Sequence, residues 1–485
     1  MSWQSASALV ALLGLALGCA TKPPSEQHWV EVRTPHFRTV SALPRPATDD
    51  LALDLELFRR AVELLAGAPL PAEAQPIDVF AFDDRRLGPS FSHGEHASYL
   101  LASPDHTTLV LRAAGGWRGD AGVALRHDFA HALLRGRDGF AAPLWYDEGI
   151  AQLASTIEVR DGAASIGGLR ADHLRALRSG PRMPVRTTLD LESFAGPQDP
   201  QRAALQAESW SLLHYLFFGQ RTPRHLPRQL LVLARADRVD DALLERELQL
   251  TSDDLDRGLQ HYPVRAQGGA LEIRSGAEAG PPFRARPLPT SEVLVELGEL
   301  ALALDRSSVA RHHFERALAS EAQAARVQAG LGAADGLDGQ WTQAAARLES
   351  ALTLAPGDPR IERAAADLWL ARAKVAEDPD TRQRYAERAR EHYRQSLTGD
   401  PTQAGAHAGI ASSHLVAGQA LDAALQALER AEAQNPASGE IRLLRVQWLL
   451  ASGQAQPAHD LARAIHARLH DPPSLPLPGD PLPAD

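Results

Sequence analysis

A register of about 34 residues in the second half of the chain constrains the fold more than any other feature of the sequence. A small residue marks the same point of successive segments, and a proline follows most of these points at a distance of five residues. The points are Ala317, Ala351, Ser396 and Ala431, the prolines are Pro356, Pro401 and Pro436, and small residues recur at Gly298, Gly330, Ala366 and Gly409, where packed helices would cross. Units of this length cannot bury their apolar faces alone, so the pattern predicts paired helices that stack into an all-α solenoid.

Paired helices with this period and a closing proline resemble the tetratricopeptide repeat. The step from Ala351 to Ser396 is 45 residues, so the third unit is predicted to carry an insertion around 377–384. We expect four to five units over 290–470, followed by a disordered Pro-rich tail at 471–485. The resemblance implies a concave face that binds a protein or peptide partner. A generic helical bundle is the alternative, and the matched prolines argue against it.

The single cysteine of the chain, Cys19, follows an apolar run from Ala6 to Gly18. The run is too short for a membrane-spanning helix and ends in small residues, as a cleavable export signal does. It resembles a bacterial lipobox, although no Lys or Arg precedes it. The resemblance implies a signal peptide at 1–18, a lipid anchor on Cys19, a tether at 19–27, and a place in the bacterial cell envelope, on the periplasmic face of the outer membrane. A plain secretory signal, or an N-terminal helix with a buried cysteine, stays open.

The composition indicates folded protein and excludes one class of partner. With 44% hydrophobic and 23% charged residues, the 485-residue chain is expected to form two or three globular domains. The net charge of −11 comes without a basic cluster, so we expect no nucleic acid partner.

The segment 28–265 mixes strand and helix patterns, which predicts an α+β domain, and the Gly- and Pro-rich stretch 266–289 is predicted to be a linker. Alternating or continuous apolar runs predict strands at 30–32, 37–40, 77–82, 99–102 and 107–111. Apolar stripes at helical spacing predict helices at 49–65, 120–135, 143–156 and 208–218.

Two histidines in the second predicted helix have the spacing of metal ligands. His127 and His131 lie four residues apart, so their side chains share one helix face and could reach one metal ion. The spacing alone is weak, because 19 histidines in this chain give roughly 0.7 such pairs by chance. His466 and His470 form a second pair with no acidic neighbour, and we expect it to have no function.

The first pair has an acidic context that the second lacks. Asp128 follows His127, and Glu148 lies 17 residues beyond His131 in the next predicted helix. That distance allows a turn and a helix that returns its carboxylate to the histidines. The predicted strand at 107–111 lies just upstream, where a substrate backbone could pair.

These residues carry a family resemblance. The sequences that carry it are LRHDFAHALL at 125–134, PLW at 143–145, EGIA at 148–151 and ESWSLLHY at 208–215. They resemble the gluzincin metallopeptidases, in particular the peptidase MA-like domains of bacterial envelope proteins, over roughly 28–263. That family often carries tetratricopeptide repeats after its catalytic domain. The resemblance implies a zincin-like fold.

The resemblance also implies roles for five residues. His127 and His131 would be imidazole ligands of Zn²⁺, Glu148 the carboxylate ligand, and water the fourth ligand. The acid after the first histidine would take a proton from that water and pass it to the leaving amine. Here it is Asp128, so the motif is HDxxH in place of HExxH, and the carboxylate is retracted by ~1.5 Å. Gln152, one turn after Glu148, stands where many gluzincins place an acid that orients a histidine.

Several nearby residues have weaker claims to a role. Tyr146, His214 and Tyr215 could stabilise an oxyanion, but aromatic residues on such helices are more often part of the core. Asp147 is expected to be solvated. The loop at 93–96 reads as an exposed polar turn. The His127–Asp128 doublet also occurs in metal-dependent phosphohydrolases, whose all-helical frame does not fit the strands predicted here.

Two functions follow from these patterns. The first is a zinc-dependent metallopeptidase, lipid-anchored in the envelope, whose repeats recruit a partner or substrate. The alternative is a scaffold with a zincin-like fold, in which Asp128 marks impaired catalysis and the repeats bind an envelope protein.

Overall fold

The computed structural model describes twelve segments of the chain, which are 28–70, 76–82, 90–91, 98–112, 116–119, 122–135, 142–191, 200–219, 225–262, 271–274, 283–318 and 323–468. The predicted signal peptide, tether and tail, together with Cys19, the 93–96 loop and His470, lie outside these residues. Within them, no helix has the length and apolar character needed to cross a membrane.

The N-terminal part combines strands and helices. Its strands are β1 (Trp29–Arg33), β2 (Phe37–Ser41), β3 (Ile77–Phe82), β4 (Tyr99–Ala102), β5 (Thr107–Arg112), β6 (Glu158–Arg160), β7 (Ala163–Ile166), β8 (Leu271–Arg274) and β9 (Arg284–Leu288). Its helices are α1 (Arg45–Ala66), α2 (Val123–Arg135), α3 (Leu144–Ser155), α4 (Ala171–Ser179), α5 (Val185–Asp190), α6 (Pro200–His214) continued by the π-helix η4 (Tyr215–Gly219), α7 (Leu226–Ala234), α8 (Asp241–Leu248) and α9 (Ser252–Gln260).

Six of the strands form one mixed sheet in the order β4-β5-β3-β2-β1-β9. The β2, β3 and β5 strands are parallel neighbours, whereas β4, β1 and β9 pair antiparallel with theirs. The strand at 107–111 was predicted to pair with a substrate, but β5 already lies between β3 and β4. Within the described residues β4 is therefore the open edge on this side of the sheet.

The central sheet is buried on both faces. Along β3, Val79 and Ala81 belong to the core formed with α1, α2 and α3, while Phe80 and Phe82 belong to a second core. That second core includes Phe314 and other residues of the first repeat helices. A strand buried on both faces has apolar residues at consecutive positions, which explains the continuous apolar run of β3.

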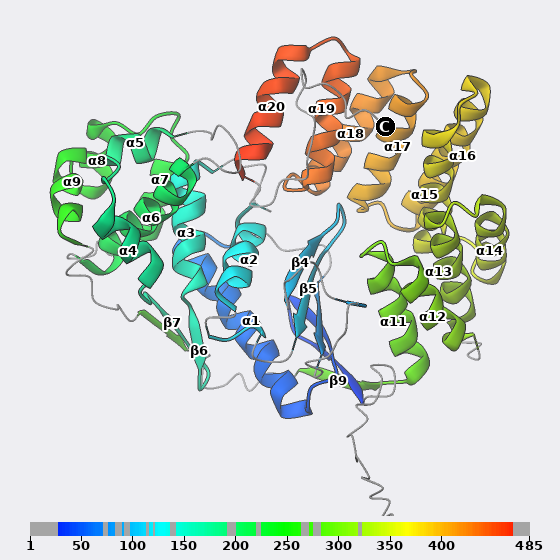
Figure 1. The fold of residues 1–485 in the computed structure, drawn as a ribbon, viewed down its shortest axis with the longest axis horizontal. Helices are drawn as coiled ribbons and strands as arrows, with labels where there is room; N and C mark the ends of the chain where they lie inside the picture. The colour runs from blue at the N-terminus through cyan, green and yellow to red at the C-terminus, as the bar shows by residue number, and fades with distance from the viewer. Residues whose placement is uncertain are drawn as a thin grey trace, which may run out of the picture.

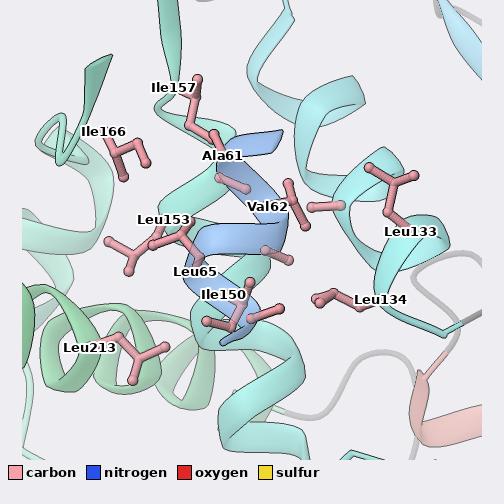
Figure 2. Close-up of a cluster of buried hydrophobic side chains, with 14 of the residues drawn as sticks. Ala61, Val62, Leu65, Leu133, Leu134, Ile150, Leu153, Ile157, Ile166 and Leu213 are labelled. Carbon is pink, nitrogen blue, oxygen red and sulfur yellow. The ribbon is translucent and has the colours of Figure 1, made fainter. Parts of the chain in front are cut away.

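Helix α1 organises the first core. Figure 2 shows Ala61, Val62 and Leu65 of α1 among apolar side chains of neighbouring elements. Leu133 and Leu134 come from α2, and Ile150 and Leu153 from α3, so one helix surface holds both later helices in place.

The C-terminal part is an array of paired helices. They are α11 (Thr290–Leu302), α12 (Ser307–Ala317), α13 (Ala324–Leu337), α14 (Trp341–Leu354), α15 (Pro359–Val375), α16 (Pro379–Gly399), α17 (Ala404–Val416), α18 (Leu421–Gln434), α19 (Gly439–Ala451) and α20 (Ala455–Arg468). In the described residues these make five pairs, and each helix packs on the next. The array curves as an arc with the β4–β5 hairpin on its inner side (Figure 1).

Small residues at the helix crossings allow this packing, as the sequence predicts. A Cβ atom at Gly298 would lie 2.7 Å from the ring of Phe314, and one at Gly330 would overlap the same ring. Gly409 stands in the same relation to Tyr393. The extra residues of the third unit lengthen the helices α15 and α16 instead of forming a separate loop.

The predicted linker at 266–289 contains two strands, so that part of the prediction was wrong. The β8 strand pairs with β7 in a three-stranded sheet with β6, and β9 pairs with β1 along the edge of the main sheet. Strand β9 is therefore followed almost directly by α11. The hairpin of β6 and β7 was also not foreseen.

Candidate metal centre

Helix α2 presents His127 and His131 on one face, as their spacing predicts. Their side chains are buried, and the two Nε2 atoms lie 3.1 Å apart. The opposite face of α2 carries Phe129, whose ring lies against Phe58 and Trp117. This aromatic packing fixes the rotation of α2 and therefore the direction in which both imidazoles point.

Helix α3 brings a carboxylate to the same point. Glu148 Oε2 lies 3.6 Å from His127 Nε2 and 3.8 Å from His131 Nε2, and its side chain is buried. Among the described residues, this is the one group of three His, Cys, Asp or Glu side chains whose ligand atoms lie within 4.8 Å of one another. The structure thus brings together the three residues that the resemblance identifies as ligands.

The glycine after Glu148 allows α3 to approach α6 closely. A Cβ atom at Gly149 would lie 2.6 Å from Leu213 Cδ1 and 3.1 Å from the carbonyl oxygen of Ser209. Since α3 and α6 are neighbours along their length, a side chain here would push α3 and Glu148 out of position.

A buried arginine holds the two ligand-bearing helices together. Arg126 donates to the carbonyl of Ser155 at the end of α3, at 3.0 Å. It also donates to the carbonyls of Trp117 and Gly119, in the segment before α2. A single guanidinium thus joins the start of α2 to the end of α3, which sets the separation of the histidines from Glu148.

Asp147 is buried, so the prediction that it is solvated was wrong. Its Oδ1 atom lies 3.0 Å from His131 Nδ1, the ring nitrogen that points away from Glu148. The reason is that all twelve residues of α3 are buried, so this helix has no solvated face on which an acid could lie. The apolar residues before Asp147 and after Glu148 were the signal in the sequence, because a buried acid needs a partner.

Gln152 does accept a hydrogen bond from a histidine, but that residue is His173 and not a member of the cluster. Its Oε1 atom is 2.9 Å from His173 Nε2 and 2.7 Å from Arg170 Nη1. Burial, together with the nearby guanidinium of Arg170, lowers the pKa of His173 to about 4. The role expected for Gln152 thus falls to Asp147, and nothing in the local sequence distinguished His173 as a partner.

Asp128 differs from its neighbours in α2 because it is exposed, whereas His127 and Phe129 are buried. It lies outside the group of converging ligand atoms.

The aromatic candidates for oxyanion stabilisation have structural partners. Tyr146 donates its hydroxyl to the carbonyl of Ala66, at 2.9 Å. His214 is fully buried, with Nδ1 2.6 Å from the Tyr262 hydroxyl and Nε2 3.2 Å from the carbonyl of Gly167. Tyr215 packs against the ring of Tyr262. These residues belong to the core, as the sequence favoured.

No protein-family model and no curated protein matches this sequence. Among solved structures, a thermophilic TPR protein of Thermus thermophilus, TTC0263, is 22% identical with a TM-score of 0.34, over 37% of this chain and 91% of that one. A MamA RS-1 double mutant is 12% identical with a TM-score of 0.29, over 36% and 92%. Yeast Tom70 is 16% identical with a TM-score of 0.30, over 55% of this chain and 47% of its own.

Proposed function

We propose that this protein is a scaffold in which a helical-repeat array binds a protein partner and a zincin-like part holds a zinc ion with little or no peptidase turnover. The single observation that carries the metal site is the convergence of His127, His131 and Glu148. Their three ligand atoms are separated by 3.1, 3.6 and 3.8 Å. A tetrahedral zinc site with bonds of 2.0–2.2 Å has edges of about 3.3–3.6 Å. The observed separations depart from this range by at most 0.2 Å, so the residues fit the ion.

The chemistry of the donors supports zinc over harder cations. Two imidazoles and one carboxylate are a set that zinc binds in hydrolases, whereas magnesium and calcium prefer oxygen ligands. Asp147 beside His131 Nδ1 supplies the outer partner that fixes ring orientation in such sites. When bound, the ion would supply a Lewis acid that lowers the pKa of a coordinated water.

Asp128 is the reason for expecting slow turnover. A general base must reach the proton that it takes. The side chain of Asp128 is one methylene shorter than that of glutamate. A misplacement of about 1 Å costs on the order of a hundredfold in rate. Asp128 would then leave metal binding intact while slowing hydrolysis.

The second candidate is an active metallopeptidase. The observations in its favour are that the three candidate ligands converge with Asp147 beside His131, and that an acid, Asp128, directly follows His127 in α2. In this case Asp128 takes the proton despite its length, and the repeats deliver the substrate.

Two measurements on the full chain test both proposals. Zinc content of the wild type and of His131→Ala tests the site, and equal zinc content in the two would contradict it. Cleavage of a peptide library by the wild type, His131→Ala and Asp128→Glu tests turnover. The scaffold proposal expects a silent wild type and a gain of cleavage in Asp128→Glu. Cleavage by the wild type that His131→Ala abolishes would instead establish the peptidase.

A further inference from the structure

The tip of the β4–β5 hairpin is bound by the inner side of the helical array (Figure 1). The Asp105 carboxylate forms an ion pair with Arg363 of α15 and accepts a hydrogen bond from the backbone N–H of Gly405 in α17, at 2.9 Å. The carbonyl of Pro104 accepts a hydrogen bond from Asn435 Nδ2, at 2.9 Å. Asn435 lies between α18 and α19, so successive repeats contact one tight turn.

The array is shaped for a carboxylate at this point. Gly405 lies in the first turn of α17, where backbone N–H groups have no partner within the helix and favour negative charge. A Cβ atom at Gly405 would overlap the guanidinium of Arg363 and lie 2.6 Å from Asp105 Oδ2. The carboxylate and the guanidinium therefore occupy the space that a side chain at position 405 would need.

Elsewhere the sheet and the array share an apolar core that contains Phe80 and Phe314, beside which Arg38 of β2 forms an ion pair with Glu296 of α11. At the hairpin tip the contacts are polar, and Arg363 has a second acid, Asp367, at 3.7 Å. Asp367 would still pair with Arg363 if the hairpin moved away. The Arg363 charge would therefore not be left without an acidic partner while another carboxylate replaced Asp105.

The hairpin connects this contact to the candidate metal centre. The β4 strand packs against α2 and, in the part of the chain that the structure describes, is an open edge to which an extended peptide could add. We infer that the inner side of the array is a docking site for an acidic turn, that the chain's own hairpin occupies it, and that a protein partner with such a turn displaces the hairpin. The inference extends the protein-binding part of the proposed function. It is independent of the metal, and its failure would leave other partner surfaces of the array untouched.

The test uses the full chain and a backbone-cyclised peptide that copies residues 102–107, followed by fluorescence anisotropy. A tethered competitor acts at about millimolar effective concentration, so the wild-type hairpin should exclude the peptide. Asp105→Ala should bind it at least tenfold more tightly than the wild type. Adding Arg363→Ala or Gly405→Ala to Asp105→Ala should reverse that gain, whereas adding the control Arg388→Ala, at an exposed arginine of α16, should not.

The peptide itself provides the second control. A matched peptide with asparagine in place of aspartate should bind Asp105→Ala about tenfold more weakly, because a hydrogen bond to a charged group is the stronger one. Hydrogen exchange should show faster exchange at the hairpin tip in Asp105→Ala, with the rest of the array unchanged. Equal affinity of the wild type and Asp105→Ala, indifference to Arg363→Ala, or no binding to Asp105→Ala at millimolar peptide would each overturn the inference.

Discussion

Replacing Asp147 by asparagine removes one charge from the candidate metal centre and leaves the shape of the side chain almost unchanged. Asp147 Oδ1 lies 3.0 Å from His131 Nδ1, and both side chains are 3% exposed. A proton on Nδ1 is donated to this carboxylate, which leaves Nε2, the nitrogen nearest His127 and Glu148, to bind a metal ion. We therefore expect Asp147→Asn to weaken zinc binding without unfolding the protein.

The size of the effect follows from the contact. A hydrogen bond to a charged group contributes about 1.5–3 kcal/mol, and a neutral one about 0.5–1.5 kcal/mol. Asparagine keeps the hydrogen bond and loses the charge, so Asp147→Asn should cost about 1–1.5 kcal/mol, which is about a five- to tenfold loss of affinity. Asp147→Ala loses both contributions, and we expect about a 10- to 100-fold loss, the range measured for outer partners of metal ligands.

Competition for zinc between the protein and a chromophoric chelator, at constant pH, measures both values. Asp172→Asn is the matched control, because Asp172 is exposed and pairs with Arg170 instead of a cluster histidine. Circular dichroism shows whether each variant is folded. If folded Asp147→Ala bound zinc as tightly as the wild type, or if Asp172→Asn lost as much affinity, the reasoning about His131 would be refuted.

Three further predictions concern stability and attachment. Phe314→Ala should lower the free energy of unfolding by about 3–5 kcal/mol in urea titrations, because its ring fills the space beside Gly298 and Gly330; a change below about 1 kcal/mol would contradict this packing. Burial lowers the pKa of His173 to about 4, so its unfolded form binds more protons between about pH 4 and 6.5. The wild type should therefore lose up to about 3 kcal/mol as pH falls through that window, and His173→Gln should lose less. Cys19→Ser should move the protein from the membrane to the soluble fraction of envelope extracts, and an unchanged membrane fraction would argue against a lipid anchor.

Local sequence patterns predicted the elements whose apolar residues recur at the spacing of a strand or of a helix. The β3 strand at 77–82 and the β4–β5 hairpin agree with the structure to within one residue, because an apolar run and a Pro-Asp turn are local signals. The 17-residue distance from His131 to Glu148 allowed their approach, but spacing along the chain does not fix the direction of a second helix, so the family resemblance was needed to identify Glu148 as a ligand.

The residues that were misread depend on partners far away in the sequence. Strand β9 has the sequence RARPL, which carries charge and a proline and does not read as a strand. It is stable as one because it lies at the sheet edge, where Pro287 needs no donor, and because Arg286 pairs with Glu31 across the sheet. Burial raises the pKa of Glu31, but hydrogen bonds from Arg33 and Arg38 outweigh burial and lower it to about 2. A network of this kind cannot be inferred from a window around residue 286.

The shared core under the sheet determines how the two parts of the molecule can influence each other. Trp29, Phe80 and Phe82 lie on the sheet face that α11, α12 and α13 cover. Aromatic side chains bury about 150–250 Å² each, so removing the repeats would expose several hundred Å² of apolar surface, as much as the largest patch on a typical soluble protein. The sheet and the first repeats must therefore move as one body, and a partner bound there could not loosen the candidate metal centre without disrupting this core. The hairpin tip is different, because an ion pair and hydrogen bonds connect it to Arg363, Gly405 and Asn435 of the later repeats. Any signal from a partner on the array to the ligand-bearing helix α2 would most directly pass through β4.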